Sequence, residues 1–301
     1  MDSKNSSIKP FVKWAGGKGQ LLPDLRSKYP SGLGSEINKY CEPFVGGGAV
    51  LFDILSQYEL DEVLINDINA ELINTYFQIQ NNVFELLSEL ERLQDHYHSL
   101  SQDGKKNEFL ARRDEFNFSK LNGDSSLSLK KASLFIFLNR TCFNGLYRVN
   151  KKGEFNVPIG SYKKPLICDR ENLLKLSKSL KNVQIQCSDY KKCLPFIDKN
   201  TFVYIDPPYR PLSQTSSFTA YSEASFNDEN QIELNQFVNS IHKKGAKVLI
   251  SNSDPKNENI NDSFFDNLYS QYRIERILAR RIINCNAESR GEINELLINN
   301  Y

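Results

Sequence analysis

Three short apolar runs along the chain each end at a carboxylate or a small polar residue and are followed by a turn. They span residues 62–67, 202–206 and 247–252. Unbroken apolar runs of this length are typical of strands that are buried on both faces, as in a parallel sheet. The pattern therefore predicts three buried parallel strands.

Helical periodicity fills the intervals between these runs. Apolar residues recur at three- and four-residue spacing from Leu72 to Leu93, and the pair Asn81 and Asn82 is expected to interrupt this helix. A second set recurs over residues 232–241 and is followed by Gly245, a residue type that favours the end of a helix. The chain thus alternates strands with helices.

This alternation predicts a doubly wound α/β fold with a mostly parallel, Rossmann-like sheet, whose ligand sites lie at the carboxyl ends of the strands. Three groups of residues follow candidate strands directly: the glycine triplet 46–48, Asp67 and residues 206–209. We therefore expect the functional site to combine these three groups.

Residues 71–165 interrupt this alternation of strands and helices. They contain helical patterns followed by a basic segment rich in Gly and Asn. We interpret this stretch as an inserted, mostly helical domain that carries a β-hairpin at its end. The catalytic domain would then consist of residues 1–70 and 166–301.

Composition narrows the class of protein. The 301 residues, 40% of them hydrophobic, can form one large α/β domain with an insertion. The most obvious apolar run, 132–138, is far shorter than the roughly 20 residues that span a bilayer, so we expect a soluble, cytoplasmic protein. The six cysteines form no CxxC pair and the three histidines complete no metal-ligand spacing, so free thiols and no metal are expected.

Charge is unevenly distributed, although the net charge is only +1. Residues 139–164 contain six basic side chains and one acid, and a second basic cluster consists of Arg276, Arg280, Arg281 and Arg290. A charge run is most often a solvated face, so contact with nucleic acid stays open at this point.

A glycine turn follows the first candidate strand. Residues 40–48, Tyr-Cys-Glu-Pro-Phe-Val-Gly-Gly-Gly, predict a short strand and a turn that opens a helix at 49–55. Glycines there let the backbone approach a ligand, although an ordinary turn would also explain them. Asp67 follows Gly48 by 19 residues, near the spacing of the acid that accepts hydrogen bonds from ribose hydroxyls in nucleoside-binding folds.

The segment from Trp14 to Lys18, Trp-Ala-Gly-Gly-Lys, has some features of a phosphate loop. That motif requires Ser or Thr after the lysine to hold magnesium, and Lys18 is followed by Gly19, which argues against ATP hydrolysis. Trp14 fits either a core residue or a loop that closes over a ligand.

The strongest local motif is Asp-Pro-Pro-Tyr at residues 206–209, directly after an apolar strand. Consecutive prolines fix the backbone and remove two N–H donors, so the Asp206 carboxylate and a carbonyl can face one point. Two acceptors suit an amine such as adenine N6, whose lone pair is delocalised into the ring. Tyr209 would stack on a flipped base, and positional catalysis of this kind needs no metal. A rigid Pro-Pro turn is the structural alternative.

These motifs occur in an order that resembles the Dam-type family of DNA adenine N6 methyltransferases. The matching segments cover nearly the whole chain and lie at residues 11–18, 42–48, 65–69, 138–160, 206–209, 217–221 and 249–252.

The resemblance implies an S-adenosylmethionine-dependent enzyme that releases S-adenosylhomocysteine and uses no metal. The implied catalytic residues are Asp206, Pro207, Pro208 and Tyr209. The implied cofactor-binding residues are Trp14, Lys18, Phe44, Gly46, Asp67, Asp189 and Asp206.

The resemblance also implies that segment 71–165 recognises double-stranded DNA through its hairpin, in the major groove. The implied DNA-binding residues are Phe143, Asn144, Arg148 and Lys151. Phe143 would wedge into the base stack and Arg148 would read a guanine edge, whereas Arg140 fits a structural role equally well. The basic segment 280–295 would face the DNA backbone before a last strand at 296–299.

We therefore predict methyl transfer to adenine N6 by base flipping, with GATC as the expected site and GATATC as the alternative. A cytosine N4 enzyme more often has Ser at the position of Asp206, and RNA has a major groove too deep and narrow for a hairpin. An inactive DNA-binding module is the rival from another class. We expect a monomer, and a restriction endonuclease acting on the same site is a candidate partner.

Overall fold

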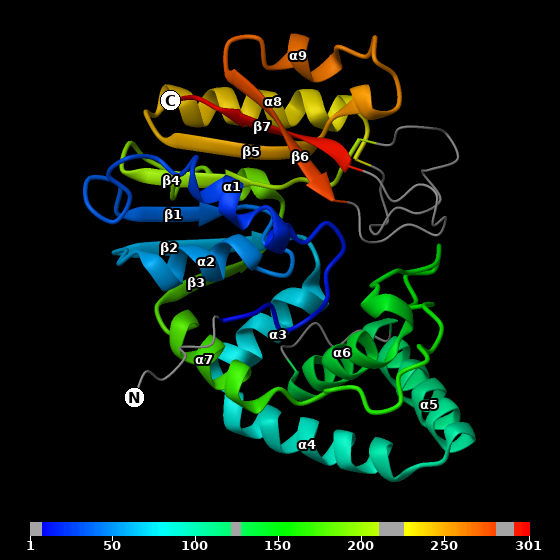
Figure 1. Ribbon diagram of the computed structural model, residues 1–301. Helices are drawn as coiled ribbons and strands as arrows, with labels where there is room; N and C mark the ends of the chain where they lie inside the picture. Colours follow the sequence, from blue (N-terminus) through cyan, green and yellow to red (C-terminus); the bar gives the residue numbers. More distant parts are fainter. Residues whose placement is uncertain (1–7, 122–127, 211–225, 281–291) are drawn as a thin grey trace.

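A seven-stranded sheet is the centre of the fold (Figure 1). The computed structural model describes residues 8–121, 128–210, 226–280 and 292–301. The strand order is β3-β2-β1-β4-β5-β7-β6. The strands are β1 (Lys39–Glu42), β2 (Glu62–Asp67), β3 (Val183–Cys187), β4 (Thr201–Ile205), β5 (Lys247–Ser253), β6 (Arg273–Arg280) and β7 (Glu292–Asn299).

The five strands from β3 to β5 are parallel, which confirms the predicted doubly wound sheet. The three predicted strands correspond to β2, β4 and β5. Every residue of β4 is buried, because helices cover both faces of the sheet at its centre. The unbroken apolar sequence of this strand follows from that environment.

Two strands, β3 and β6, were not predicted, and β7 begins four residues before the predicted start at Leu296. Both missed strands lie at the edges of the sheet, where half of the side chains face solvent. β6 pairs with β7, which in turn pairs antiparallel with β5, and charged residues interrupt the apolar sequence of β6. Edge strands often carry charged or polar residues, here charges in β6 and two glutamines in β3, so they lack the continuous apolar signal.

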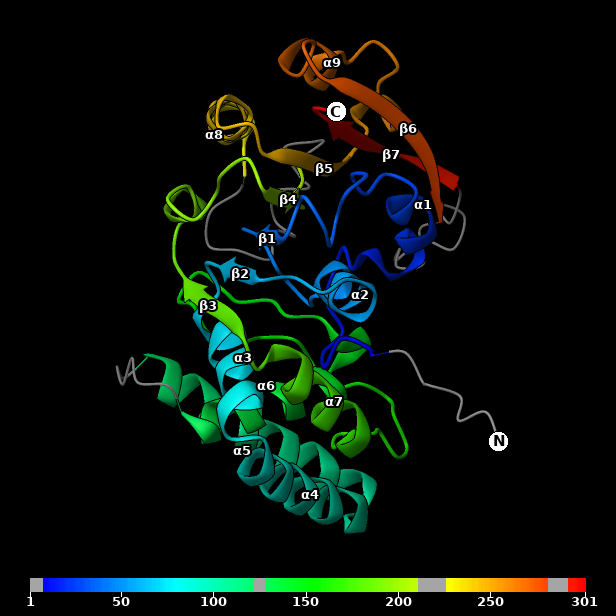
Figure 2. The same ribbon diagram turned by 90° about the vertical axis from the view of Figure 1, so that its left-hand side faces the viewer.

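Helices pack on both faces of the sheet (Figure 2). One face is covered by α1 (Leu22–Arg26), α2 (Ala49–Gln57), α3 (Ala70–Asn81) and α7 (Arg170–Leu180). The other is covered by α8 (Asp228–Lys243) and α9 (Phe264–Leu268). Alternate residues of each strand serve the two cores: Phe202 and Tyr204 face the first, and Val203 and Ile205 the second.

The predicted helix break at Asn81 and Asn82 and the predicted helix end near Gly245 are confirmed. α3 ends at Asn81 and α4 (Val83–Ser99) begins two residues later, with Asn82 between them. Gly245 follows α8 with a φ of 81°, a left-handed conformation that favours glycine after a helix end.

Helices α4, α5 (Gln102–Leu121) and α6 (Leu129–Thr141) gather beyond the β3 edge of the sheet (Figure 1). Nine of the thirteen residues of α6 are buried, so α6 is the centre of this helical region. Its buried side chains belong to the same hydrophobic cluster as the first face of the sheet. The helical region is therefore packed continuously onto the sheet, and the division at residues 71–165 stays a prediction.

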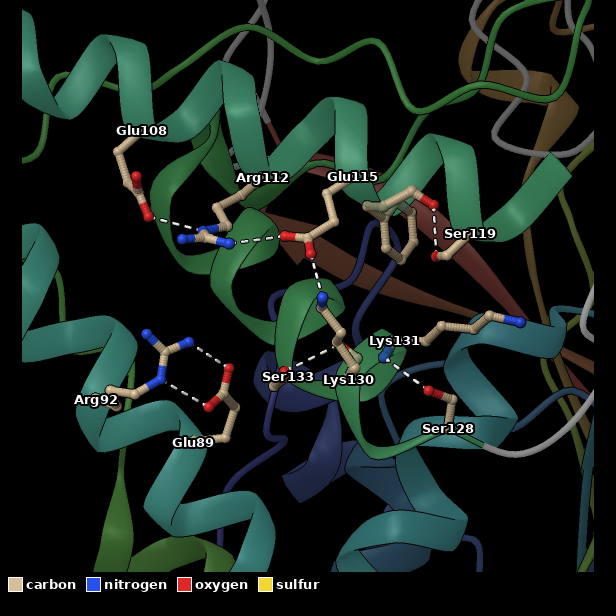
Figure 3. Close-up of polar contacts among 11 residues, drawn as sticks. Glu89, Arg92, Glu108, Arg112, Glu115, Ser119, Ser128, Lys130, Lys131 and Ser133 are labelled. Carbon is tan, nitrogen blue, oxygen red and sulfur yellow. Dashed lines mark hydrogen bonds and ion pairs between the residues drawn. The ribbon is translucent and has the colours of Figure 1, made fainter. Parts of the chain in front are cut away.

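Ion pairs link the exposed sides of these helices (Figure 3). Arg112 contacts Glu108 and Glu115 on α5, and Lys130 of α6 also contacts Glu115. Pairs of this exposure contribute about 0–1 kcal/mol each, so apolar packing of α6 is the larger stabilising term. None of the described helices is long and apolar enough to cross a bilayer.

The predicted hairpin follows α6. Two isolated antiparallel bridges join its arms, Cys142 with Ile159 and Val149 with Phe155, in place of a continuous ladder. The Asn139 side chain fixes the base of the hairpin, because it donates to the carbonyls of Lys13 and Gly145 at 2.8 Å each. The hairpin base is thus tied to the amino-terminal segment.

Candidate active site

The strand order reverses between β1 and β4, so the loops after these two neighbouring strands diverge at the carboxyl edge of the sheet. Such a switch point is where doubly wound folds bind their ligands. The glycine triplet 46–48 follows β1, and residues 206–209 follow β4. Both groups therefore lie at the expected place.

The glycine loop is shaped by two close approaches. A Cβ on Gly48, whose φ is 75°, would lie 2.4 Å from Tyr76 Oη, and a Cβ on Gly46 would lie 2.9 Å from Trp14 Cδ1. Tyr76 Oη donates a hydrogen bond of 3.0 Å to the Gly46 carbonyl. Larger residues would displace these rings, so the glycines allow Trp14 and Tyr76 to pack directly on the loop.

Asp67, at the end of β2, lies beside this loop. Its Oδ2 accepts from the Gly46 N–H at 3.0 Å and its Oδ1 accepts from the Asn69 N–H at 2.9 Å. Burial raises the pKa of Asp67, while the backbone N–H donors act in the opposite direction. The structure thus brings together Gly46 and Asp67, as the strand-end argument expects.

A third loop joins these two through Asn66. The Asn66 amide donates to the carbonyls of Pro43 and Ser188 at 3.0 and 2.9 Å. Phe44 packs against Tyr190 at 5.1 Å between ring centroids, and Asp189 is exposed and accepts from the Lys191 N–H. Phe44 and Asp189 therefore both lie on the loops that border the glycine turn.

Lys18 is buried beside residues 206–209, with only 4% of its surface exposed. Its Nζ lies 2.7 Å from Asp206 Oδ1 and 3.2 Å from Glu295 Oε1, and it donates to Tyr209 Oη at 2.7 Å. The sequence predicted Lys18 only as a cofactor-binding residue. The structure shows in addition that it contacts two residues of the Asp-Pro-Pro-Tyr motif.

The opposite charges in this cluster stabilise one another's ionised forms. Burial would lower the pKa of Lys18, but Asp206, Tyr209 and Glu295 together raise it well above its ordinary value. Burial raises the pKa of Asp206, and Lys18 opposes that shift. The ammonium therefore favours the ionised form of Asp206, whose side chain is partly buried, with 21% of its surface exposed.

Ser251, at the carboxyl end of β5, is a second partner of Asp206. Its Oγ donates to Asp206 Oδ1 at 3.1 Å and lies 2.8 Å from Tyr204 Oη. Ser251 lies in the matching segment 249–252 but was not predicted to be a site residue. The expectation that ligand sites lie at the carboxyl ends of parallel strands would have identified it. Glu295 was not predicted either. It lies within β7, which is antiparallel to β5, so the expectation about the carboxyl ends of parallel strands does not apply to it.

The remaining residues of the motif are held from the α8 side. Pro207 is buried, whereas Pro208 is exposed and its carbonyl accepts from Gln231 Nε2 at 3.3 Å. Arg210, which follows Tyr209, forms ion pairs with Asp228 at 2.5 Å and Asp262 at 2.6 Å. The loop is thus anchored on both sides, and the Tyr209 residue is 37% exposed.

The predicted DNA-binding residues lie on the hairpin, and none of them enters the buried cluster. Phe143 is 51% exposed, and Asn144, next to it, has a φ of 55°. Arg148 is exposed and its Nε donates to Asn156 Oδ1 across the hairpin at 2.8 Å. Lys151 is also exposed.

Arg140 has a structural role, since it donates to the Phe11 carbonyl at 2.8 Å and burial lowers its pKa. In the second basic cluster, Arg276 forms ion pairs with Asp254 and Asp266. Segments 217–221 and 281–291, with Arg281 and Arg290, lie outside the described residues.

Within the described residues, no group of three or more His, Cys, Asp and Glu could hold a metal ion. The five cysteines in this part of the chain are free thiols.

A glycine loop, an acid after β2 and an Asp-Pro-Pro-Tyr loop at the switch point of a doubly wound sheet define a nucleoside-cofactor-dependent enzyme of the Rossmann-like methyltransferase class. Residues 14–283 match the model of the D12 class N6 adenine-specific DNA methyltransferases. The chain belongs to this family.

Relatives resemble the chain over almost its whole length. The type II methyltransferase M.MjaIII of Methanocaldococcus jannaschii is 48% identical, over 98% of this chain and 99% of the relative. The type II methyltransferase M1.LlaDCHI of Lactococcus lactis subsp. cremoris is 36% identical, over 98% and 96%. The DNA adenine methylase of Escherichia coli (strain K12) is 33% identical, over 95% and 93%.

Membership identifies the protein as a DNA methyltransferase specific for adenine, with S-adenosylmethionine as its methyl donor. Its substrate is DNA.

Proposed function

We propose that the protein flips an adenine out of duplex DNA to the site beside residues 206–209 and methylates its N6, with GATC as the target. The observation that carries this proposal is the buried contact of Lys18 with both Asp206 and Tyr209. A charged carboxylate and an aromatic ring, fixed at the switch point, are suited to hold a flipped base and its amine.

The cofactor pocket would be formed by the loops around the switch point. The proposed cofactor-binding residues are Trp14, Lys18, Phe44, Gly46, Asp67, Asp189 and Asp206. The fit is supported by Asp67, whose carboxylate is fixed next to the glycine loop by two backbone N–H groups and suits ribose hydroxyls. When bound, S-adenosylmethionine supplies a sulfonium-activated methyl group.

The catalytic loop would act by positioning. Both observed hydrogen-bonding contacts of the Asp206 carboxylate are made by Oδ1, and we assign Oδ2 to one N–H of the amine. The Pro207 carbonyl would accept the other N–H, and Pro208 keeps the loop rigid. Tyr209 would stack on the base, a contact that contributes about 1–3 kcal/mol in related settings.

Residues 71–165 are proposed to be the target recognition domain, with the hairpin in the major groove. Phe143 is exposed enough to enter the base stack, and Arg148 is exposed, with its guanidinium hydrogen-bonded to Asn156 across the hairpin. Arg148 would read a guanine edge, with Asn144 and Lys151 as further DNA contacts. The enzyme is proposed to act as a monomer.

GATATC is the alternative target, because a few hairpin residues decide which bases are read. Two of the relatives carry the name type II methyltransferase, which supports a restriction endonuclease of the same specificity as a partner. The name DNA adenine methylase of a third relative supports a solitary enzyme as the alternative.

The test is transfer of labelled methyl to four duplexes: one with GATC, one with GATATC, one with neither, and one with GATC already N6-methylated on both strands. We expect label only on the unmethylated GATC duplex. Label on another duplex would keep the chemistry and change the target. A folded protein that labels none of them would favour the inactive DNA-binding module.

Arg148→Ala is expected to relax the sequence preference at one base pair by about 1–3 kcal/mol, because one bidentate contact to a base edge is lost. The measurement is the ratio of methylation rates on the cognate duplex and on duplexes with each single base changed. Lys152→Ala is the matched control, since Lys152 is exposed on the same hairpin and has no assigned base contact. An unchanged preference in Arg148→Ala would show that another residue reads this base.

A further inference from the structure

Glu295 enters the active site from a strand remote in sequence from the other site residues. It lies on β7, which pairs with β5 and β6, and only 3% of its surface is exposed. Tyr209 Oη donates to its Oε1 at 2.5 Å, and Lys18 Nζ lies 3.2 Å from the same oxygen. One carboxylate oxygen thus contacts both the catalytic loop and the lysine that pairs with Asp206.

The strand geometry holds Glu295 in this orientation. Leu297, two residues further along β7, is buried in the core on the face that also contains Tyr204, whereas Leu296 is buried on the other face. Alternation along the strand therefore directs Glu295 toward the first face, on the side of Tyr204. In the sheet register, Glu295 lies opposite Ser253 of β5 and Ile277 of β6.

Two carboxylates share one ammonium in this cluster. Lys18 is closer to Asp206, at 2.7 Å, than to Glu295, at 3.2 Å. Burial raises the pKa of Glu295, and Lys18 opposes this shift. The Lys18 ammonium is therefore attracted to two carboxylates at once, and its position is set by Glu295 as well as by Asp206.

We propose that Glu295 is a positioning residue for methyl transfer: it fixes Lys18 and Tyr209 so that Asp206 and the aromatic ring face the flipped adenine together. This inference rests on the proposed function of the 206–209 loop. Glu295 itself touches neither the base nor the cofactor in this assignment, so its effect is transmitted through the two side chains that it binds.

Glu295→Gln preserves the shape and an acceptor oxygen but removes the charge. We expect the single-turnover rate to fall by about 10- to 100-fold, the effect of losing a charged hydrogen-bond partner, with little change in the dissociation constant for duplex DNA. The acid limb of the rate's pH profile should move to lower pH. The reason is that loss of a neighbouring negative charge lowers the pKa of Asp206.

Tyr209→Phe is the second variant, since it removes the bond to Glu295 but leaves the contact of Glu295 with Lys18. It should lower the rate without moving the acid limb. If Glu295 acts through Tyr209, the rate loss of the double variant will be smaller than the product of the two single losses. Purely multiplicative losses would overturn the part of the inference that concerns Tyr209.

Glu275→Gln is the matched control, because Glu275 lies on the adjacent strand β6 and pairs with Lys28 at 2.6 Å, away from the 206–209 loop. It should retain the wild-type rate. Wild-type rate and pH profile in Glu295→Gln would overturn the inference. So would a rate loss that follows reduced thermal stability with no shift of the acid limb. An active Asp206→Ala enzyme would instead overturn the proposed function of the loop.

Discussion

Asp206→Ala is expected to lower the rate of methyl transfer by about 10²- to 10³-fold, the range found when one preorganised catalytic hydrogen-bonding group is removed. Affinity for duplex DNA should remain close to that of the wild type. In the proposed mechanism the carboxylate would act on the extruded amine, whereas the hairpin and the basic surfaces would contact the flanking duplex. Turnover and binding are therefore separable in this variant.

The measurements are a single-turnover assay with labelled S-adenosylmethionine and a fluorescence-anisotropy titration with the same duplex. Asp206→Asn is the matched variant, since it keeps an acceptor oxygen and removes the charge that pairs with Lys18. Its rate should lie between those of the wild type and Asp206→Ala. Equal losses of rate and of DNA affinity in Asp206→Ala would contradict the assigned role.

Lys18→Met is expected to lower the free energy of unfolding by about 3–5 kcal/mol. Removal of one partner from a buried ion pair leaves the other charge uncompensated, and here Asp206 and Glu295 both lose their ammonium. The measurement is urea-induced unfolding followed by circular dichroism. Activity should fall as well, because Tyr209 loses one of its two observed hydrogen-bond partners.

This loss of stability should be larger at about pH 8 than at about pH 5. Without Lys18 the raised pKa values of Asp206 and Glu295 rise further, so the folded state binds protons that the unfolded chain releases. The free energy of unfolding then increases as the pH falls from the folded-state pKa toward the unfolded value of about 4. An equal loss at both pH values would show that the carboxylates are not the cause.

Lys28→Met provides the control for this experiment. Lys28 pairs with Glu275 at 2.6 Å, and both side chains are about a quarter exposed. A pair of this exposure contributes about 0–1 kcal/mol, so this variant should unfold almost as the wild type does. A loss as large as that of Lys18→Met would mean that burial does not distinguish the two lysines.

The centre of the sheet could be predicted because burial on both faces leaves its strands almost wholly apolar. The apolar run at 202–206, predicted as a buried strand, corresponds to β4. β3 could not be predicted in the same way. Gln184 and Gln186 alternate with apolar residues at the edge of the sheet, and no local sequence signal decides whether such a segment pairs.

The same distinction applies to the site. Gly46, Asp67 and Asp206 follow parallel strands, and parallel strands bring their carboxyl ends to one edge of the sheet, so a rule about strand ends finds these residues. Glu295 reaches the cluster from within an antiparallel strand. Its contact with Lys18 depends on the packing of distant elements, which no spacing in the sequence encodes.

The buried cluster also sets an order of events during synthesis of the protein. Among the residues of this cluster, Lys18 is synthesised before Asp206 and Tyr209, and Glu295 is synthesised after them. A nascent chain that has already folded β1, β2 and β4 therefore still lacks the acid that holds Lys18 and Tyr209. A chain that ended before β7 would lack Glu295 and also the strand that joins β6 to β5, so we expect unfinished chains to methylate DNA more slowly than the finished enzyme.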